Sequence, residues 1–177
     1  FPGFCAMTQG VDMERDLVDE LLSQWAEERP KMHVSPLGVV VRIQLLSKLL
    51  QQRTTRALKR HGLKHWEYDV LSMLRRQGEP FELPSADIAE SALLSTGATT
   101  ARIDGLEGRG LVSRRRSSSD RRSILVKLTA EGRTIVDAAI ESRLEDASDA
   151  LSMIPIEEQR RLAASLRMLL LAMEPKR

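Results

Sequence analysis

The chain has 177 residues with 27 Lys or Arg against 25 Asp or Glu, a formal net charge of +2, and its length fits one domain with a sizeable core. Its single cysteine excludes an intramolecular disulfide and a cysteine-rich zinc site. Because it has neither an apolar run long enough to span a bilayer nor a secretory signal segment, we expect a soluble cytoplasmic protein with no membrane partner.

Residues 1–11 show no hydrophobic periodicity and indicate a disordered leader or an expression remnant. Cys5 lies there, and no basic neighbour activates its thiol. After the leader, a helix is expected from Met13 to about Glu28, with Asp12 as its cap. The apolar stripe of this helix consists of Leu17, Leu21, Leu22 and Trp25.

A long helix is expected to begin at Ser35 and Pro36 and to run to about Arg60. It carries two apolar stripes, one with Val40, Val41, Leu45 and Leu49 and the other with Val39, Ile43, Leu46 and Leu50. A helix that is apolar on two faces must be buried on both, which is more than one small domain easily supplies. We therefore assign residues 12–60 to dimerisation and to an effector pocket.

The pattern of residues 61–128 predicts a DNA-binding domain. A helix over 65–76 comes first, and Ser85 is expected to cap a second, short helix. A third helix is expected to begin at 95–97, and the glycines of 108–110 end it. Two short helices with a tight polar joint form a helix-turn-helix, whose second helix fits a major groove.

Two strands, at 111–116 and 123–128, surround the polar turn 117–120 and predict an arginine-rich hairpin, or wing. The segment 102–127 has cations at Arg102, Arg109, Arg114, Arg115, Arg116, Arg121, Arg122 and Lys127, against acids at Asp104, Glu107 and Asp120. The balance reverses in 11–30, where acids dominate. A localised basic patch suits phosphate neutralisation, although an arginine-rich hairpin can also be plain solvated surface.

The C-terminal segment 129–177 predicts two more helices, one from Thr129 to about Leu151 and the last from Pro155. The last helix has its apolar residues at Leu162, Leu166, Leu169, Leu170 and Met173. Because the DNA-reading part cannot cover this surface, a homodimer through the terminal helices is expected. The fold class is mainly α with a small β-wing: a winged helix-turn-helix with N- and C-terminal helices that form a dimerisation domain.

The residues expected to contact double-stranded DNA are Ser95, Thr96, Thr99, Thr100, Arg102, Arg116, Asp120, Arg121 and Arg122. Arg102 is expected to reach base edges from the recognition helix. Asp120 is expected to orient Arg122 toward the minor groove, where contacts are largely blind to sequence. The turn 117–119 is polar but uncharged, so Arg121 and Arg122 must carry that contact.

Asp120, Arg121 and Arg122, followed by an apolar strand and by Leu128 and Thr129, resemble the wing signature of MarR-type regulators. The segment 105–112 is similar to the end of the recognition helix in that family. The resemblance covers about 12–173. The segment 24–30, followed by the long helix, further resembles the N-terminal extension of the urate-responsive, PecS/HucR-like branch.

That resemblance implies an effector site formed by Trp25, Asp69 and Arg114. Arg114 would pair with Asp69 or grip a planar anion such as urate, and Trp25 would supply a flat apolar wall. Asp69 is expected to be partly buried. Without a ligand, Trp25 would be a core or dimer residue, Asp69 a surface or capping acid, and Arg114 a phosphate contact.

The expected function is a homodimeric repressor that a small planar anion releases from a palindromic operator. The alternatives are a constitutive or architectural DNA-binding protein and a MarR-type regulator that answers to a phenolic compound. No nucleophile–base pair, phosphate-binding loop or metal cluster indicates an enzyme, and no cofactor or metal is expected. The sequence does not identify the operator, the regulated genes or the effector.

Overall fold

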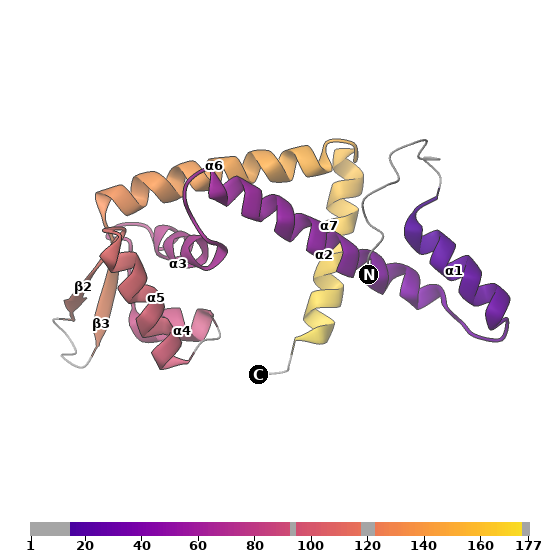
Figure 1. The fold of residues 1–177 in the computed structure, drawn as a ribbon, viewed down its shortest axis with the longest axis horizontal. Coiled ribbons are helices and arrows are strands. Elements are labelled where there is room, and N and C mark those ends of the chain that lie inside the picture. Colours follow the sequence, from indigo (N-terminus) through magenta and orange to yellow (C-terminus); the bar gives the residue numbers. More distant parts are fainter. Residues whose placement is uncertain (1–14, 93–94, 118–122, 175–177) are drawn as a thin grey trace. The chain divides into compact units, whose positions relative to one another are not determined.

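A computed structural model describes residues 15–92, 95–117 and 123–174 (Figure 1). It divides into two compact units, Phe1–Gln52 and Arg53–Arg177, which are described separately below. The first unit contains α1 (Leu17–Glu28) and most of α2 (Ser35–Lys59), and α2 continues into the second unit.

Helix α1 begins later than the sequence pattern indicated. Asp16, and not Asp12, is its N-cap: the Asp16 carboxylate accepts hydrogen bonds from the backbone N–H groups of Val18 and Asp19. The Asp19 carboxylate accepts from the Asp16 N–H in return, which completes a capping box. The helix therefore begins at Leu17, and the expected start at Met13 is wrong by one turn; Met13 itself lies outside the described residues.

Arg42 of α2 binds the start of α1. Its Nε lies 2.7 Å from Asp16 Oδ2, and its Nη2 lies 2.6 Å from Asp19 Oδ1. The hydrogen bond from Arg42 and the N-cap contacts lower the pKa of Asp16 to about 2. Gly38 of α2 permits the close approach of α1, because a Cβ at this position would lie only 3.3 Å from Cδ1 of Leu22. We call this arrangement the Arg42 clasp.

The second unit contains the rest of α2 and the elements that follow it in the chain (Figure 1). They are α3 (His65–Arg75), β1 (Glu82–Pro84), α4 (Ser85–Ser91), α5 (Thr96–Gly108), β2 (Val112–Arg116), β3 (Ile124–Leu128), α6 (Ala130–Leu151) and α7 (Ile156–Met173). We call α3 to β3, residues 65–128, the winged head. Figure 1 shows its helices and strands gathered at one end of α6.

The strands form one antiparallel sheet in the order β1-β3-β2. Arg114 of β2 is paired with Val126 of β3, and Leu83 of β1 is paired with the same Val126 from the other side. Strand β1 was not expected from the sequence. Ser85 was expected to cap α4, but it is the first helical residue, and Pro84 occupies the cap position without a side-chain hydrogen bond.

The core of the second unit lies inside the winged head. Large side chains from α3, α4, α5 and the sheet are fully buried there: Leu71, Leu74, Ile88, Ile103, Leu106, Val112 and Val126. Helix α6 adds Val136 and Ala139 to this cluster. The helical and strand periodicities predicted from the sequence therefore converge on one core, which fixes the recognition helix α5 against α3 and the sheet.

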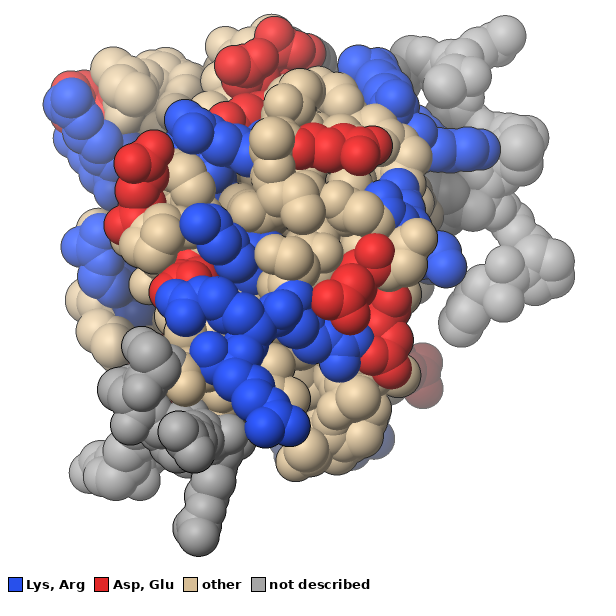
Figure 2. Space-filling model, turned by 90° about the vertical axis from the view of Figure 1, so that its left-hand side faces the viewer, with Lys and Arg blue, Asp and Glu red and all other residues tan. Residues whose placement is uncertain are grey.

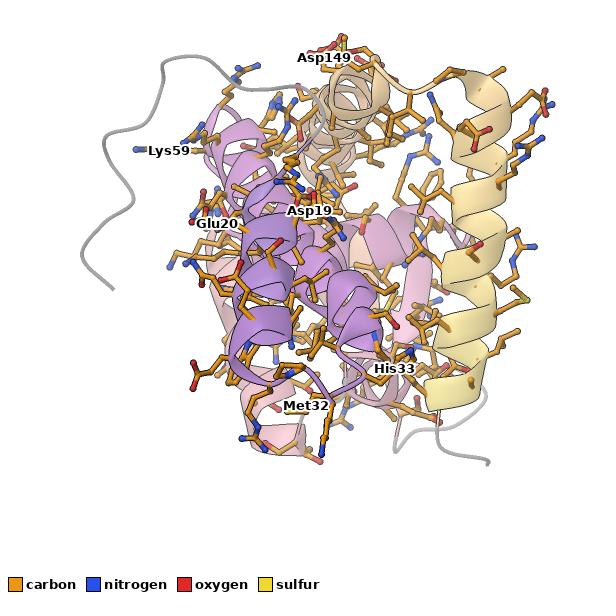
Figure 3. All side chains as sticks on the ribbon, turned by 90° about the vertical axis from the view of Figure 1, so that its right-hand side faces the viewer. Asp19, Glu20, Met32, His33, Lys59 and Asp149 are labelled. Carbon is orange, nitrogen blue, oxygen red and sulfur yellow. The ribbon has the colours of Figure 1, made fainter. Side chains whose placement is uncertain are left out.

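The C-terminal turns of α2 are joined to α6 by polar contacts. Arg53 Nη2 lies 3.0 Å from Asp146 Oδ1, and Arg143 Nη1 donates to Thr54 Oγ1 at 2.6 Å. His61 Nε2 lies 2.8 Å from Ser142 Oγ. Helix α7 is different, because none of its residues is buried. Figure 3 shows its side chains projecting on both sides of the helix.

Candidate nucleic-acid interface

Helices α4 and α5 form the expected helix-turn-helix. Ser95 caps α5: its hydroxyl oxygen accepts from the Ala98 N–H at 3.3 Å. At the other end Gly110 adopts φ +72, and the Leu111 N–H donates to the Leu106 carbonyl at 3.0 Å, as in helices that end at a left-handed glycine. Both ends of α5 lie where the sequence placed them.

The outer face of α5 carries some of the expected DNA contacts and not others. Ser95, Thr96 and Thr100 are exposed. Thr99 is only 3% exposed and its hydroxyl donates to the Ser95 carbonyl, so the structure places Thr99 on the inner face with Ile103. The sequence held the signal for this, because Thr99, Ile103 and Leu106 recur at helical spacing on one side.

Arg102 lies against α3 and does not extend along the outer face of α5. Its guanidinium carbon is 5.5 Å from the centroid of the Trp66 ring, a cation–π geometry. The side chain is half-buried. Reading of base edges by Arg102 therefore stays a prediction that requires the side chain to leave Trp66.

The wing is formed by β2 and β3, and the Ser117 N–H donates to the Ser123 carbonyl at 2.9 Å. Arg116, an expected DNA contact, is exposed at the outer end of β2. The other expected wing contacts, Asp120, Arg121 and Arg122, lie outside the described residues.

Carboxylates of the winged head neutralise part of its own positive charge. Arg109 pairs with Glu67, Arg114 with Asp104 and Glu107, and Arg115 with Glu82. Figure 2 shows Lys and Arg side chains gathered on this end of the molecule with acidic side chains between them. Within the described residues of the head, Arg76, Arg102, Arg116 and Lys127 have no ion pair. Contact of Arg116 with a phosphate stays a prediction.

Arg114 ties the wing to the recognition helix. Its Nη2 pairs with Asp104, its Nε lies 3.0 Å from Glu107 Oε2, and its backbone N–H donates to Glu107 Oε1 at 3.1 Å. Asp104, with Glu107, raises the pKa of the Arg114 guanidinium. The sequence suggested Asp69 as the ion-pair partner of Arg114, but the structure gives Arg114 these two carboxylates of α5.

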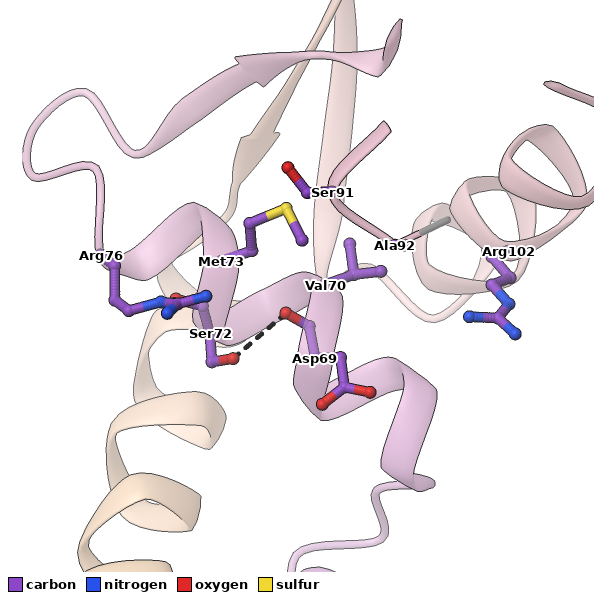
Figure 4. A pocket seen from close by; sticks show the side chains of 8 residues that line it. All are labelled: Asp69, Val70, Ser72, Met73, Arg76, Ser91, Ala92 and Arg102. Carbon is purple, nitrogen blue, oxygen red and sulfur yellow. Dashed lines mark hydrogen bonds between the residues drawn. The ribbon is translucent and has the colours of Figure 1, made fainter. Parts of the chain in front are cut away.

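Asp69 was expected to be partly buried, but its side chain is 53% exposed, and its Oδ2 lies 3.8 Å from Nδ1 of His65, one turn earlier on α3. It borders a cavity of about 340 Å³ between α3 and the corner of α4 and α5 (Figure 4). The cavity is lined by Asp69, Val70, Ser72, Met73, Arg76, Ser91, Ala92 and Arg102. Arg102 thus shares a cavity with Asp69, which the sequence reasoning missed because it assigned Arg102 to DNA alone.

Trp25 is 42% exposed and belongs to the first unit, whereas Asp69 and Arg114 belong to the second. A site formed by all three residues stays a prediction. No helix among the described residues is long and apolar enough to cross a membrane. In the same described ranges, no group of three or more His, Cys, Asp or Glu side chains is arranged to hold a metal ion.

Known proteins share this arrangement. A description of the MarR family matches residues 61–123. The HTH-type transcriptional regulator PecS of Dickeya dadantii is 31% identical over 149 residues, which cover 84% of this chain and 90% of PecS. Sco5413, a MarR family transcriptional regulator from Streptomyces coelicolor, is 27% identical with a TM-score of 0.64, covering 78% of this chain and 95% of its own.

A mutant MarR from E. coli, whose crystal structure contains operator DNA, has a TM-score of 0.64 over 88% of this chain and 99% of its own. At 20% identity this likeness concerns the fold. The winged helix-turn-helix, the family match and the relationship to PecS lead to one conclusion: the chain belongs to the MarR family of DNA-binding, non-enzymatic transcriptional regulators.

Proposed function

We propose that the protein is a homodimeric repressor that binds a palindromic operator and is released from it by a small planar anion such as urate. One observation carries the effector part: the cavity beside Asp69 is also lined by Arg102, a side chain of the recognition helix. A ligand in that cavity would touch the helix that reads DNA. The resemblance to the urate-responsive branch supports the choice of urate.

The homodimer is supported by apolar side chains that the single chain leaves in water. On α7 these include Leu166, Leu169, Leu170 and Met173, and on α2 they include Val39, Leu46 and Leu50. Exposed apolar surface on this scale marks an association surface. A two-fold dimer would present two copies of α5 to two operator half-sites about one turn of DNA apart.

Release of DNA would follow from charge. An anion that binds Arg102 in the cavity is repelled by the carboxylate of Asp69, which borders the same space. Relief of that repulsion would displace α5 from the position in which it enters the major groove. In the proposed site Arg114 would pair with the charge of the ligand and Trp25 would cover its flat face. Ligand and operator would then bind with negative coupling, so that each weakens the other.

The ligand test begins with an operator that wild-type protein selects from a random-sequence DNA library. Urate binding is measured by calorimetry, and operator affinity is measured with and without urate. Salicylate, a planar phenolic acid, runs in parallel to separate the two effector classes. Saturable urate binding together with weaker operator binding supports the proposal. Operator affinity that neither compound changes leaves a constitutive DNA-binding protein.

Two substitutions separate binding from release. Trp25→Phe should weaken urate binding and leave operator affinity intact, because only the flat wall of the site changes. Asp69→Asn should keep urate binding and blunt the release of DNA, because the carboxylate repulsion is gone. Glu141→Gln, which removes an exposed carboxylate from α6, is the matched control and should change neither. Asp69→Asn with undiminished release would contradict the repulsion mechanism.

A further inference from the structure

Glu67 is a buried carboxylate that no DNA or effector contact uses. Its side chain is 4% exposed although it lies in the first turn of α3. Glu67 Oε2 accepts the Lys64 N–H at 2.8 Å, so the carboxylate caps α3. The same oxygen lies 2.7 Å from Nη1 of Arg109. A buried carboxylate requires partners of this kind, because an uncompensated charge in the interior is strongly unfavourable.

Arg109 is the C-cap residue of the recognition helix α5. Besides Glu67, its guanidinium binds the turn between α2 and α3: Nη2 donates to the Gly62 carbonyl at 3.1 Å. Gly62 presents that carbonyl from a left-handed conformation, φ +64, which glycine adopts without strain. One guanidinium therefore joins the end of α5 to the α2–α3 turn and to the cap of α3.

The direction of these contacts distinguishes Arg109 from Arg116, the expected DNA contact of the wing. Arg116 is exposed at the outer end of the wing strand with no carboxylate partner among the described residues. Two of the Arg109 nitrogens instead bind acceptors of the protein itself, the buried Glu67 carboxylate and the Gly62 carbonyl. Arg109 thus has its hydrogen-bonding capacity directed away from a phosphate and toward the scaffold.

We propose that Glu67 and Arg109 are positioning residues for DNA recognition: their ion pair fixes the C-terminal end of α5 on the α2–α3 turn and so sets the angle at which α5 enters the major groove. Trp66, beside Glu67, contacts α5 at a second point through Arg102. Two anchors on one turn of α3 fix the orientation of α5, whereas one would leave it free to rotate. The inference rests on DNA binding by the winged head and on no effector.

The change in operator affinity caused by Glu67→Gln has opposite signs under a purely electrostatic role and under a positioning role, which makes the proposal testable. Glu67→Gln adds one positive charge to the protein, so electrostatics alone would tighten its binding to every DNA. If Arg109 were a phosphate contact, release from Glu67 would strengthen it further. A positioning role predicts the opposite change for the operator, because α5 loses its anchor. The affinity of Glu67→Gln for the operator then falls, whereas its affinity for random DNA does not.

The experiment uses the full chain, an operator duplex selected from a random-sequence library by wild-type protein, and a random duplex of equal length, over a series of salt concentrations. The variants are Glu67→Gln, Arg109→Met, the double variant and Arg109→Lys. Arg75→Met is the matched control, because it removes an arginine that joins α3 to Asp137 of α6 and does not touch α5. Hydrogen exchange at Leu111, whose N–H bonds the end of α5, reports the anchor directly.

We expect Glu67→Gln and Arg109→Met each to lower the ratio of operator to random-DNA affinity roughly tenfold, about the effect of one wrong base pair. The double variant should lose no more than either single one, Arg109→Lys should recover part of the loss, and Leu111 should exchange faster in the variants that lack the pair. The Arg75→Met control should keep the ratio.

Equal weakening on both duplexes by Arg109→Met, with a salt slope flatter by about one charge, would make Arg109 a phosphate contact and overturn the proposal. Tighter operator binding by Glu67→Gln, or an unchanged ratio in all variants, would overturn it too. If Glu67→Gln does not fold, the comparison of Arg109→Met with Arg109→Lys decides alone, because that side chain is 39% exposed.

Discussion

Apolar side chains are buried in the winged head and exposed on α7. In the head, Ile88, Leu106 and Val126 are completely buried by their own chain. In α7, Leu170 is 63% exposed and Met173 75% exposed, and no residue is buried. The head is therefore stable through contacts within one chain, whereas α7 gains little from its own chain, and the proposed second copy would cover it. The comparison predicts that DNA reading and assembly are separable properties of this sequence.

Removal of α7 should have the largest effect on operator binding. A chain that ends after Pro155 should be monomeric, or precipitate, and its affinity for the palindromic operator should fall about 10²–10⁴-fold because the two heads are no longer linked. The winged head should keep its helical circular dichroism. Light scattering and DNA titration check this. A truncated chain that still binds as a dimer would contradict the separation of the two regions.

A substitution that leaves a cavity in the winged head tests whether the head is stable through contacts within its own chain. Leu106→Ala removes a fully buried side chain of α5 and should lower the free energy of unfolding by about 2–5 kcal/mol. The dimer should persist in native buffer, since Leu106 lies in the core of the head. Denaturant unfolding at several protein concentrations measures the loss. A cost below about 1 kcal/mol would place Leu106 at a site that collapses around the cavity.

A single change on α7 should act on assembly instead. Leu166→Ala should raise the dimer dissociation constant about tenfold, or roughly 1.4 kcal/mol, because the side chain leaves a contact with the second copy. A dilution series by mass photometry gives the constant. Unfolding of the winged head should be unchanged at high protein concentration. A lower free energy of unfolding with an unchanged dimer dissociation constant would show that Leu166 packs within its own chain.

The Arg42 clasp should have the smallest effect, confined to α1. Because the pKa of Asp16 is lowered from 3.8 to about 2, its contribution is complete above pH 3.8 and disappears as the pH falls through 2. Hydrogen exchange in α1 should therefore stay constant from pH 8 to 5, after correction for the intrinsic rate. Asp16→Asn should loosen α1 at pH 7, because asparagine keeps the cap and loses the ion pair. Equal protection of α1 in this variant would remove the clasp from the account.

Local signals were enough to predict most of the fold. The start of α5 at 95–97, its end at the glycines of 108–110 and the apolar strand at 123–128 each depend on a few neighbouring residues, and the structure confirms them. The start of α1 was also available, because Asp16 and Asp19 have the spacing of a capping box.

Features that depend on distant residues could not be predicted. Strand β1 is three residues long and exists because β3 returns beside it. The pairing of Arg114 with Asp104 and Glu107 depends on how β2 leaves α5, which no spacing encodes. The burial of Glu67 is of the same kind, since its partner Arg109 is 42 positions away.

In the proposed complex, two copies of this chain, joined by their terminal helices, place two winged heads on one two-fold operator. The mass of the complex with the selected operator duplex tests this arrangement most directly. We predict the mass of the duplex plus two chains of 19.9 kDa each, and much weaker binding to a duplex that carries one half-site. A complex with one chain, bound to a half-site as tightly as to the full operator, would contradict the account.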